Sequence, residues 1–454
     1  MKLLDNLTKT HGDQLAISSS LGRINYNEIV TESRNYSEFF SGKRVAFHSS
    51  NIIDAVVFMV AVDGFGASLV LLQPEEDIGA TVDLIDESGV DLVISDRFIE
   101  LEKLVHIPVF QNINDALKRC VHEKKVFDKK SNTSWIISTS GTTGKPKLVE
   151  HSLYSLTKTS KNNKEKGRNQ VWGLLYGFTR FAGLQVVLQS LLNGSTLVAP
   201  DVHCSLGEKL SMLSKYNCTH LSATPTMWRQ ISMNPLSKNL SLKQITLGGE
   251  ISDDKILGGL NKSYPSAYVT HIYASTEAGV GFSVKDGKSG FPAIYLSNPP
   301  NGVDIKVVGG RLWIRNDHVG DKYLGNDKNV SEDGWVDTGD NVSVNKDRVH
   351  FLGRDNGVIN VGGNKVHPET VESVLLSHPM VDDAKVYAKK NPIMGALVVA
   401  DIIVRYQGLE DKEVIREIKE FLSNKLEPFM VPAIVKIVNG FDVNSAGKVM
   451  RKQQ

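Results

Sequence analysis

Short apolar segments alternate with longer amphipathic segments over the first hundred residues of the chain. Buried strands are expected at residues 44–47, 69–72 and 92–95, and an apolar helical stretch separates the first two of them. Strands that alternate with helices are typical of a mostly parallel sheet with both faces covered. The same pattern returns at residues 170–200 and 218–249, so several α/β layers are expected before about residue 280.

A different pattern begins after Gly302. Short strands are expected at Val303–Val308, Arg311–Ile314 and Val342–Val344, with Asn, Asp and Gly between them, and they predict a smaller β-rich subdomain. Beyond Gly353 the sequence predicts a strand pair, an amphipathic helix, further strands, a charged helix and a terminal strand. This order of elements favours a small α+β domain at the end of the chain.

Composition and charge narrow the function classes. The chain has 454 residues, with 52 Lys and Arg against 51 Asp and Glu, so its net charge is +1 and no overall basic field favours nucleic acid. The most apolar stretch, residues 52–72, is interrupted by Asp54 and Asp63, and no membrane span is expected. The polar first residues argue against a secretory signal, and three widely spaced cysteines fit a reducing, cytoplasmic compartment.

A glycine-rich loop follows the apolar strand Trp135–Ile137 and has the sequence STSGTTGKPK. Glycine permits positive φ, so successive backbone N–H groups converge on an anion, while hydroxyl groups and lysine add donors and charge. The sequence therefore predicts a phosphate-binding loop. Its predicted contact residues are Thr139, Ser140, Gly141, Thr142, Thr143, Gly144 and Lys147.

The composition of this loop has two other interpretations. The P-loop of nucleotide-hydrolysing enzymes needs four residues between its glycines and then a helix with free N–H groups. Here two residues separate Gly141 from Gly144, and Pro146 stands where that helix should begin, so the P-loop is excluded. An ordinary surface loop has a similar composition and remains the alternative.

The loop resembles that of the adenylate-forming superfamily, which comprises acyl- and aryl-CoA synthetases, adenylation domains of nonribosomal peptide synthetases, and luciferases. The family loop has the approximate form [ST]-S-G-[ST]-T-G-x-P-K-G, and this chain departs from it only at Leu148. A second segment, YASTE at residues 273–277, resembles Y-G-x-T-E with alanine in place of glycine. Gly249 and Glu250 resemble the turn that lines the adenine pocket.

The resemblance assigns roles to the YASTE segment. The aromatic face of Tyr273 would stack on adenine beside Ala274. The carboxylate of Glu277, next to the hydroxyl of Thr276, would hold the Mg²⁺ that accompanies ATP. A strand end followed by a helix cap is the alternative interpretation of the same residues.

The segment GWVDTGD, residues 334–340, matches the family's G-W-x-x-T-G-D at every specified position. The resemblance implies that Asp340 accepts hydrogen bonds from both ribose hydroxyls, which suits the two oxygens of a carboxylate. Arg354 would add a second ribose contact at a hinge between domains. The family usually has Asp or Lys two residues later, where this chain has Asn356, so the choice of Asn356 or Asp355 as hinge residue stays open.

Two further motifs lie near the C-terminus. Gly362 and Gly363 belong to a segment similar to G-G-x-[KR]-V-x-P-x-E-[IV]-E, in which the glycines let the thin arm of pantetheine pass close to the backbone. Lys448 stands in a segment similar to x-x-x-G-K-[IV]-x-R and would place its ammonium between a carboxylate and the α-phosphate. A solvated lysine in the tail is the alternative for Lys448.

Together these motifs imply an AMP-forming acid–thiol ligase that uses ATP and Mg²⁺ to convert a small carboxylic acid to an acyl-adenylate. The acyl group would then pass to CoA or to the phosphopantetheine of a carrier protein. The implied fold is α/β, with a large N-terminal domain (residues 1–353) of layered α/β subdomains plus a β-rich subdomain, and a small, mobile α+β lid (residues 354–454). Lys448, Thr276 and Glu277 would be catalytic. A luciferase-like adenylating oxidase and a catalytically silent binding relative are the alternatives.

Few features of the sequence indicate which acid is the substrate. The segment Phe178–Gly183 contains no acidic residue where adenylation domains for α-amino acids keep an Asp, so an acyl or aryl acid is expected instead. Ile359-Asn360 with the following glycines resembles aryl-acid enzymes slightly more than fatty-acid enzymes. Arg180 has two interpretations, a partner for a substrate carboxylate or a member of a structural ion pair.

Overall fold

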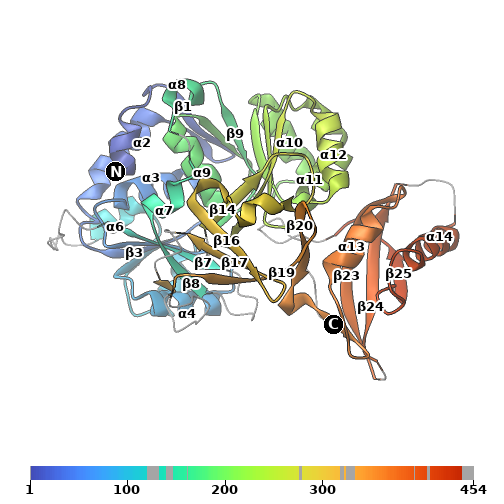
Figure 1. Cartoon of the computed structure of the whole chain (residues 1–454). Helices are drawn as coiled ribbons and strands as arrows, with labels where there is room; N and C mark the ends of the chain where they lie inside the picture. Colours follow the sequence, from blue (N-terminus) through green and yellow to red (C-terminus); the bar gives the residue numbers. More distant parts are fainter. Residues whose placement is uncertain are drawn as a thin grey trace.

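The computed structural model describes residues 2–119, 132–139, 147–160, 162–275, 279–316, 322–323, 333–392, 394–405 and 410–441. These residues form a large N-terminal part built from three sheets and a smaller C-terminal part built around a fourth sheet (Figure 1). The C-terminal part lies beside the large part rather than inside it. The predicted fold class, a layered α/β N-terminal domain with a small α+β C-terminal domain, is confirmed.

The first sheet has seven strands in the order β18-β8-β7-β4-β3-β5-β6. Its strands from β7 to β6 are parallel, whereas β8 and β18 form an antiparallel edge. The expected strands at residues 44–47, 69–72 and 92–95 lie in this sheet. Its bounds are β3 (Arg44–His48), β4 (Ser68–Leu71), β5 (Leu92–Ser95), β6 (Val109–Phe110), β7 (Ser134–Thr139), β8 (Lys147–Ser152) and β18 (Lys322–Tyr323).

The second sheet has eight strands in the order β14-β13-β12-β11-β9-β10-β1-β2, and its central strands are parallel. Their carboxyl ends meet at one edge, which is where open α/β sheets place ligands. The bounds are β1 (Leu15–Ser19), β2 (Gly22–Asn25), β9 (Val171–Leu174), β10 (Thr196–Ala199), β11 (His220–Ala223), β12 (Gln244–Gly248), β13 (Tyr268–Ser275) and β14 (Gly279–Val284).

The α/β layers expected before about residue 280 are these two sheets. Helices α3 (Ile52–Val62) and α9 (Phe181–Asn193) are apolar along most of their length, and both belong to the largest core cluster together with strands of the two sheets. A helix that is apolar on all sides must be covered on all sides. This requirement accounts for the division into two layers with buried helices between them.

The remaining helices of the large part cover the outer faces of the sheets or join strands. They are α1 (Leu3–Leu7), α2 (Tyr26–Ser37), α4 (Ile78–Ser88), α5 (Phe98–Leu101), α6 (Ile113–Arg119), α7 (Leu153–Thr157), α8 (Lys164–Gly167), α10 (Leu206–Lys215), α11 (Pro225–Met233) and α12 (Asp254–Ser263), with 3₁₀ turns η1 (Pro235–Asn239), η2 (Ala293–Leu296) and η3 (Pro300–Gly302).

The expected β-rich subdomain is a five-stranded antiparallel sheet in the order β15-β20-β19-β17-β16. Its apolar face packs on Phe282 of β14 and on η2, so it joins the edge of the second sheet. The bounds are β15 (Phe291–Pro292), β16 (Val303–Val308), β17 (Arg311–Asn316), β19 (Val336–Val344) and β20 (Arg348–Arg354).

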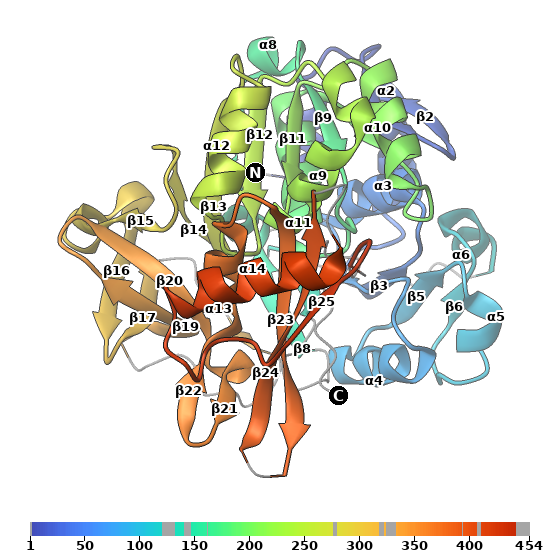
Figure 2. The same ribbon diagram turned by 90° about the vertical axis from the view of Figure 1, so that its right-hand side faces the viewer.

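The C-terminal part has a core of its own, formed by five strands and two helices. Helix α14 (Asp411–Ser423) buries Val414, Ile418 and Leu422, which recur every four residues and form the apolar stripe of an amphipathic helix. Figure 2 shows the sheet with α13 and α14 on one side of it. The other elements are η4 (Asp355–Gly357), β21 (Ile359–Val361), β22 (Asn364–Val366), α13 (Pro368–Leu376), β23 (Val381–Asn391), β24 (Gly395–Val404) and β25 (Ile434–Ile437). Across the described part of the chain, no helix has the length and apolar character needed to cross a membrane.

Candidate active site

The turn after β12 and the end of β13 lie next to each other at the carboxyl edge of the second sheet. The two strands are parallel neighbours, with Gly248 opposite Ile272, so Gly249 and Glu250 lie beside the predicted Tyr273–Ala274 segment. Gly249 has φ of 82°, a conformation that favours glycine and lets the chain turn immediately after the strand. Two segments that the sequence suggested separately therefore share one location.

Tyr273, Asp340 and Arg354 form a hydrogen-bonded cluster between two sheets. Asp340 on β19 and Arg354 on β20 are direct partners in the antiparallel ladder, and the Arg354 Nε atom donates to Asp340 Oδ1 at 2.9 Å. The Tyr273 hydroxyl, which comes from β13, donates to Asp340 Oδ2. Burial, together with the nearby charge of Asp340, holds the pKa of Tyr273 well above its usual value, so the phenol stays a proton donor.

The ring of Tyr273 is itself part of an aromatic stack. The rings of Phe282 and Phe351 lie nearly parallel to it, with centroid distances of 5.3 and 5.2 Å, which is an offset-stacked geometry. These contacts fix the plane of the tyrosine ring. The stacking of adenine on Tyr273 remains a prediction.

The predicted phosphate loop joins two antiparallel strands. Thr139, the last residue of β7, is the ladder partner of Lys147, the first residue of β8, so the backbone leaves and returns at the same point of the sheet. The loop therefore leads from strand to strand, whereas a P-loop leads from a strand into a helix. This connection agrees with the exclusion of a P-loop from the sequence.

Several predicted residues lie outside the described part of the chain, and their roles remain predictions. They are Ser140, Gly141, Thr142, Thr143 and Gly144 of the phosphate loop, Thr276 and the proposed metal ligand Glu277, and the proposed catalytic Lys448.

The two glycines that are predicted to let the pantetheine arm pass close to the backbone are at the tip of the β21–β22 hairpin. Gly362 and Gly363 are both exposed, and a side chain at Gly362 would meet only Met394 of the same domain, whereas Gly363 has open space beside it. In this orientation of the C-terminal part, the hairpin tip faces solvent instead of being enclosed by the cluster around Tyr273.

The predicted hinge lies directly after the Asp340–Arg354 pair. Gly353 has φ of 131°, and a Cβ atom there would collide with the carboxylate of Glu369 on α13. The Asp355 carboxylate accepts from Asn341 Nδ2 at 2.7 Å and pairs with Arg311 Nη2 at 2.8 Å. Asp355 is thus tied to the β-rich sheet, and the chain turns away from that sheet within η4.

Arg180 pairs with a carboxylate of the protein. Its Nη2 atom lies 3.3 Å from Glu75 Oε1, and its side chain is 14% exposed. Of the two interpretations of Arg180, the structural ion pair is the one formed here. Glu75 follows β4 in the other sheet, so nothing near Arg180 in the sequence identified it as the partner.

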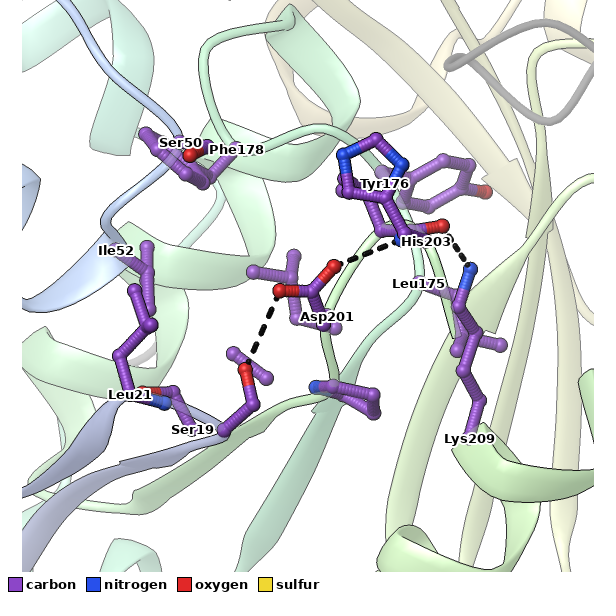
Figure 3. Close-up of a pocket in the computed structure, with 15 residues that line it drawn as sticks. Ser19, Leu21, Ser50, Ile52, Leu175, Tyr176, Phe178, Asp201, His203 and Lys209 are labelled. Atoms are coloured by element: carbon purple, nitrogen blue, oxygen red, sulfur yellow. Dashed lines mark hydrogen bonds between the residues drawn. The ribbon is translucent and has the colours of Figure 1, made fainter. Parts of the chain in front are cut away.

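A small pocket of about 60 Å³ opens at the carboxyl ends of β1, β9 and β10 (Figure 3). Asp201 at its centre accepts from the backbone N–H of His203 at 2.8 Å and from the Ser20 hydroxyl at 3.4 Å. Tyr176 lines this pocket, and burial raises its pKa, with a further contribution from the charge of Glu250. None of the residues predicted as a site lines the pocket, and no sequence motif marked it.

The chain matches two family models in sequence order. Residues 4–324 match the model described as AMP-binding enzyme, and residues 370–448 match the model described as AMP-binding enzyme C-terminal domain. The first match alone covers more than half of the chain. The predicted site residues from Thr139 to Glu277 fall within this first match, and Lys448 is the last residue of the second.

Individual relatives are distant. The 2-succinylbenzoate–CoA ligase of Bacillus subtilis is 24% identical over 439 residues, which cover 91% of this chain and 87% of that protein. A plipastatin synthase polypeptide of the same organism is 24% identical over 434 residues, covering 88% of this chain but only 17% of that much longer protein.

A solved structure has the same fold. The o-succinylbenzoate–CoA synthetase of Bacillus subtilis, in complex with its acyl-adenylate intermediate, superposes with a TM-score of 0.76 at 20% identity and covers 99% of this chain and 96% of that one. At this identity the likeness establishes the shared architecture of the two proteins.

Proposed function

Because the chain belongs to the family of AMP-binding enzymes, we propose that it is an AMP-forming ligase that joins a carboxylic acid to a thiol. In the first step the acid attacks the α-phosphorus of ATP, pyrophosphate leaves and an acyl-adenylate forms. In the second step a thiolate attacks the acyl carbonyl, a thioester forms and AMP leaves with the bonding electrons.

The observation that carries this proposal is the cluster of Tyr273, Asp340 and Arg354. A carboxylate offers about four acceptor positions, of which Tyr273 and Arg354 take one on each oxygen. Asp340 keeps a 13% exposed side chain and therefore has acceptor positions left for a pair of neighbouring hydroxyls. The 2′- and 3′-hydroxyls of a ribose are such a pair, and Arg354, 48% exposed, is placed beside them.

The rest of the nucleotide would follow from this anchor. Gly249 and Glu250 lie beside Tyr273, where the adenine ring would lie. Residues Thr139 to Lys147 would hold the β- and γ-phosphates through backbone N–H groups and hydroxyls. Lys448 would stabilise the charge that develops on the transferring phosphoryl group, so catalysis would depend on positioning and electrostatics.

Magnesium would be held by Glu277 beside Thr276. A carboxylate with an adjacent hydroxyl is a hard oxygen donor set, which suits Mg²⁺ shared with ATP phosphates. When bound, the ion would neutralise charge on the phosphate oxygens.

The acid is proposed to be an acyl or aryl acid, not an α-amino acid. The absence of an acidic residue in Phe178–Gly183 argues against recognition of an α-amine. Arg180, which lies in the same segment, forms an ion pair with Glu75. The similarity to a 2-succinylbenzoate–CoA ligase supports an aryl acid and CoA, while the similarity to a plipastatin synthase keeps a carrier protein as the alternative acceptor. A free thiol acceptor fits a reducing, cytoplasmic compartment.

The two domains are proposed to meet at Gly353–Arg354, with residues 1–353 binding ATP and acid and residues 354–454 forming the mobile lid. The second step needs the Gly362–Gly363 tip at the active site, whereas that tip is exposed in this orientation. A rotation at the hinge would supply the second arrangement.

Exchange of labelled pyrophosphate into ATP tests this function. The full-length protein is assayed with Mg²⁺ and a panel of aryl, short-chain acyl and hydroxy acids, followed by CoA and carrier protein as competing acceptors. Exchange that depends on one class of acid is the expected result. Lack of exchange with every acid would reject the ligase in favour of a silent relative, and oxygen uptake without a thioester would favour an oxidase.

A further inference from the structure

A cluster of charged side chains joins the C-terminal domain to the large domain. Helices α11 and α12 of the large domain face the beginning of β23, and Arg229 on α11 lies with its Nη1 atom 3.5 Å from Asp383 Oδ1. The other nitrogen, Nη2, pairs with Asp253 of the large domain. Lys255 on α12 donates to the backbone carbonyls of His378, at 3.1 Å, and of Val381.

This cluster is nearly closed to solvent. The side chains of Arg229, Asp253 and Asp383 are 11%, 14% and 2% exposed. Asp383 Oδ2 is buried and has no hydrogen-bond partner among the residues that the structure describes. A buried carboxylate with an unsatisfied oxygen is costly, so the contact between the domains depends on the compensating positive charge.

Arg229 is surrounded by more negative charges than its own single positive charge can neutralise. Glu250, Asp253 and Asp383 all interact electrostatically with its guanidinium, and Glu250 and Asp253 also act unfavourably on Asp383. Removal of Arg229 would leave these three carboxylates without the guanidinium that all of them interact with, whereas removal of the charge on Asp383 would leave Arg229 with two carboxylates. The two changes should therefore have opposite effects on the contact between the domains.

The same arginine is connected to the candidate nucleotide site. Glu250, in the turn beside Tyr273, accepts a hydrogen bond from the backbone N–H of Thr226 at 3.0 Å, and Thr226 is in the first turn of α11. Arg229 lies one turn further along that helix. One short helix therefore contacts the predicted adenine turn at its start and the C-terminal domain through Arg229.

We propose that Arg229 is a positioning residue that holds the C-terminal domain against the nucleotide-binding turn by neutralising the carboxylates of Glu250, Asp253 and Asp383. The inference rests on the proposed two-step function only where it says which of the two steps this orientation of the domain serves. Because the Gly362–Gly363 tip is exposed here, the docked orientation serves adenylate formation, and Arg229 must part from Asp383 when the domain rotates for thiol transfer.

Distance measurements test the docking without any substrate. Spin labels are attached to Lys238→Cys on the large domain and Lys412→Cys on α14, both exposed, with Cys120 and Cys204 changed to serine and the 1% exposed Cys218 kept. The variants are Arg229→Gln, Asp383→Asn, the double variant and Arg229→Lys. Asp304→Asn is the matched control, because its ion pair with Arg315, at 2.7 Å, lies within the β16–β17 hairpin.

Arg229→Gln is expected to lose the docked distance, while Asp383→Asn, Arg229→Lys and Asp304→Asn keep it. The double variant should regain much of the docked population that Arg229→Gln loses. An unchanged distance in Arg229→Gln, a loss in Asp383→Asn as large as in Arg229→Gln, or a double variant no better than Arg229→Gln would overturn the proposal. Circular dichroism checks folding. If Arg229→Gln does not fold, the docked fraction of the spin-labelled protein that keeps Arg229 and Asp383 is measured at different pH values. A docked fraction that does not rise between pH 7 and pH 5 would count against the proposal.

Activity then separates this inference from the proposed function. Arg229→Gln should lower acid-dependent pyrophosphate exchange roughly 5- to 50-fold through kcat, with thiolysis of a supplied acyl-adenylate retained. Loss of both half-reactions together would contradict a positioning role. If no acid supports exchange in the unsubstituted protein, the proposed function fails, yet the distance measurements still decide whether Arg229 docks the domain.

Discussion

The hydroxyl group of Tyr273 donates a hydrogen bond to the carboxylate of Asp340, and this bond joins the eight-stranded sheet to the β-rich sheet. Arg354 donates to the other oxygen of the same carboxylate. Asp340 is therefore oriented from two sides, and one of its two partners, Tyr273, comes from the strand next to the Gly249–Glu250 turn. The proposed ribose site depends on this arrangement.

Substitution of Asp340 tests the ribose site. Asp340→Ala removes the acceptors for both hydroxyls, so the KM for ATP should rise by roughly 10- to 100-fold, the usual value of hydrogen bonds to a charged group. Tyr273→Phe keeps the carboxylate and loses one orienting bond, so a rise of about fivefold is expected. Initial-rate kinetics measure both, with Asp304→Ala on the β16–β17 hairpin as control. Equal effects of Asp340→Ala and Asp304→Ala would reject the assignment.

The role of Lys448 is tested by separating the half-reactions. Lys448→Ala should lower pyrophosphate exchange by about 100-fold or more, because the variant lacks the charge that faces the transferring phosphoryl group. Thiolysis of a supplied acyl-adenylate should continue. Lys436→Ala, at an exposed position on β25, is the matched control and should leave both steps intact. Exchange that survives in Lys448→Ala would show that this lysine does not act on the phosphoryl group.

Gly353 should not tolerate a side chain. Gly353→Ala would place a methyl group against the Glu369 carboxylate at a φ of 131°, so the free energy of unfolding should fall by about 1–3 kcal/mol. Gly259→Ala is the control, because that helical glycine has open space around it, and it should be neutral or stabilising. Thermal unfolding followed by circular dichroism measures both. A fully stable Gly353→Ala variant would mean that Glu369 and the backbone adjust freely at the hinge.

Docking of the C-terminal domain should respond to pH through Asp383. Burial raises the pKa of Asp383 from 3.8 to about 6, despite the opposing effect of Arg229 on α11, and Glu250 and Asp253 raise it further. Lys255, Asp382 and Arg405 are further charged groups in this cluster, and Arg405 pairs with Asp382 at 2.6 Å. Asp383 therefore binds a proton more tightly in the docked state than an exposed carboxylate would. The stabilisation that protonated Asp383 gives to the docked state is complete below pH 4 and is lost as the pH rises through 6.

The spin-label distance measured between pH 7.5 and pH 4.5 tests this response. The docked fraction of the unsubstituted protein should grow as the pH falls. Asp383→Asn should be docked throughout and lose most of the dependence on pH. A docked fraction that falls on acidification, or a response that persists in Asp383→Asn, would assign the effect to another group.

Local sequence predicted some of these features and missed others. The strands around residues 44–47 and 92–95 were predictable because a buried strand needs only a short apolar run between turn residues. Asp340 and Arg354 were assigned to one site through motifs, and the structure places them opposite each other in a ladder. The packing of Phe282 and Phe351 against Tyr273 was not predictable, since it depends on how two sheets meet.

The contacts made by Arg229 and Arg180 are also among the features that the local sequence did not predict. Each arginine pairs with a carboxylate on a different layer or domain, Asp383 and Glu75 respectively, and neither carboxylate lies in a recognisable motif. Periodicity and turn chemistry describe neighbours along the chain, whereas these ion pairs arise only when separate units pack together. The charge cluster between the domains therefore required the structure.

The central claim is that the carboxylate of the acid attacks the α-phosphorus of ATP. The acid that supports pyrophosphate exchange is labelled with oxygen-18 in its carboxyl group, and the AMP released after thiol transfer is analysed by mass spectrometry. The account predicts one labelled oxygen in the phosphate of AMP, because the bond that breaks in the second step is the one between the acyl carbon and the bridging oxygen. Unlabelled AMP, or ADP as the product, would contradict an acyl-adenylate intermediate.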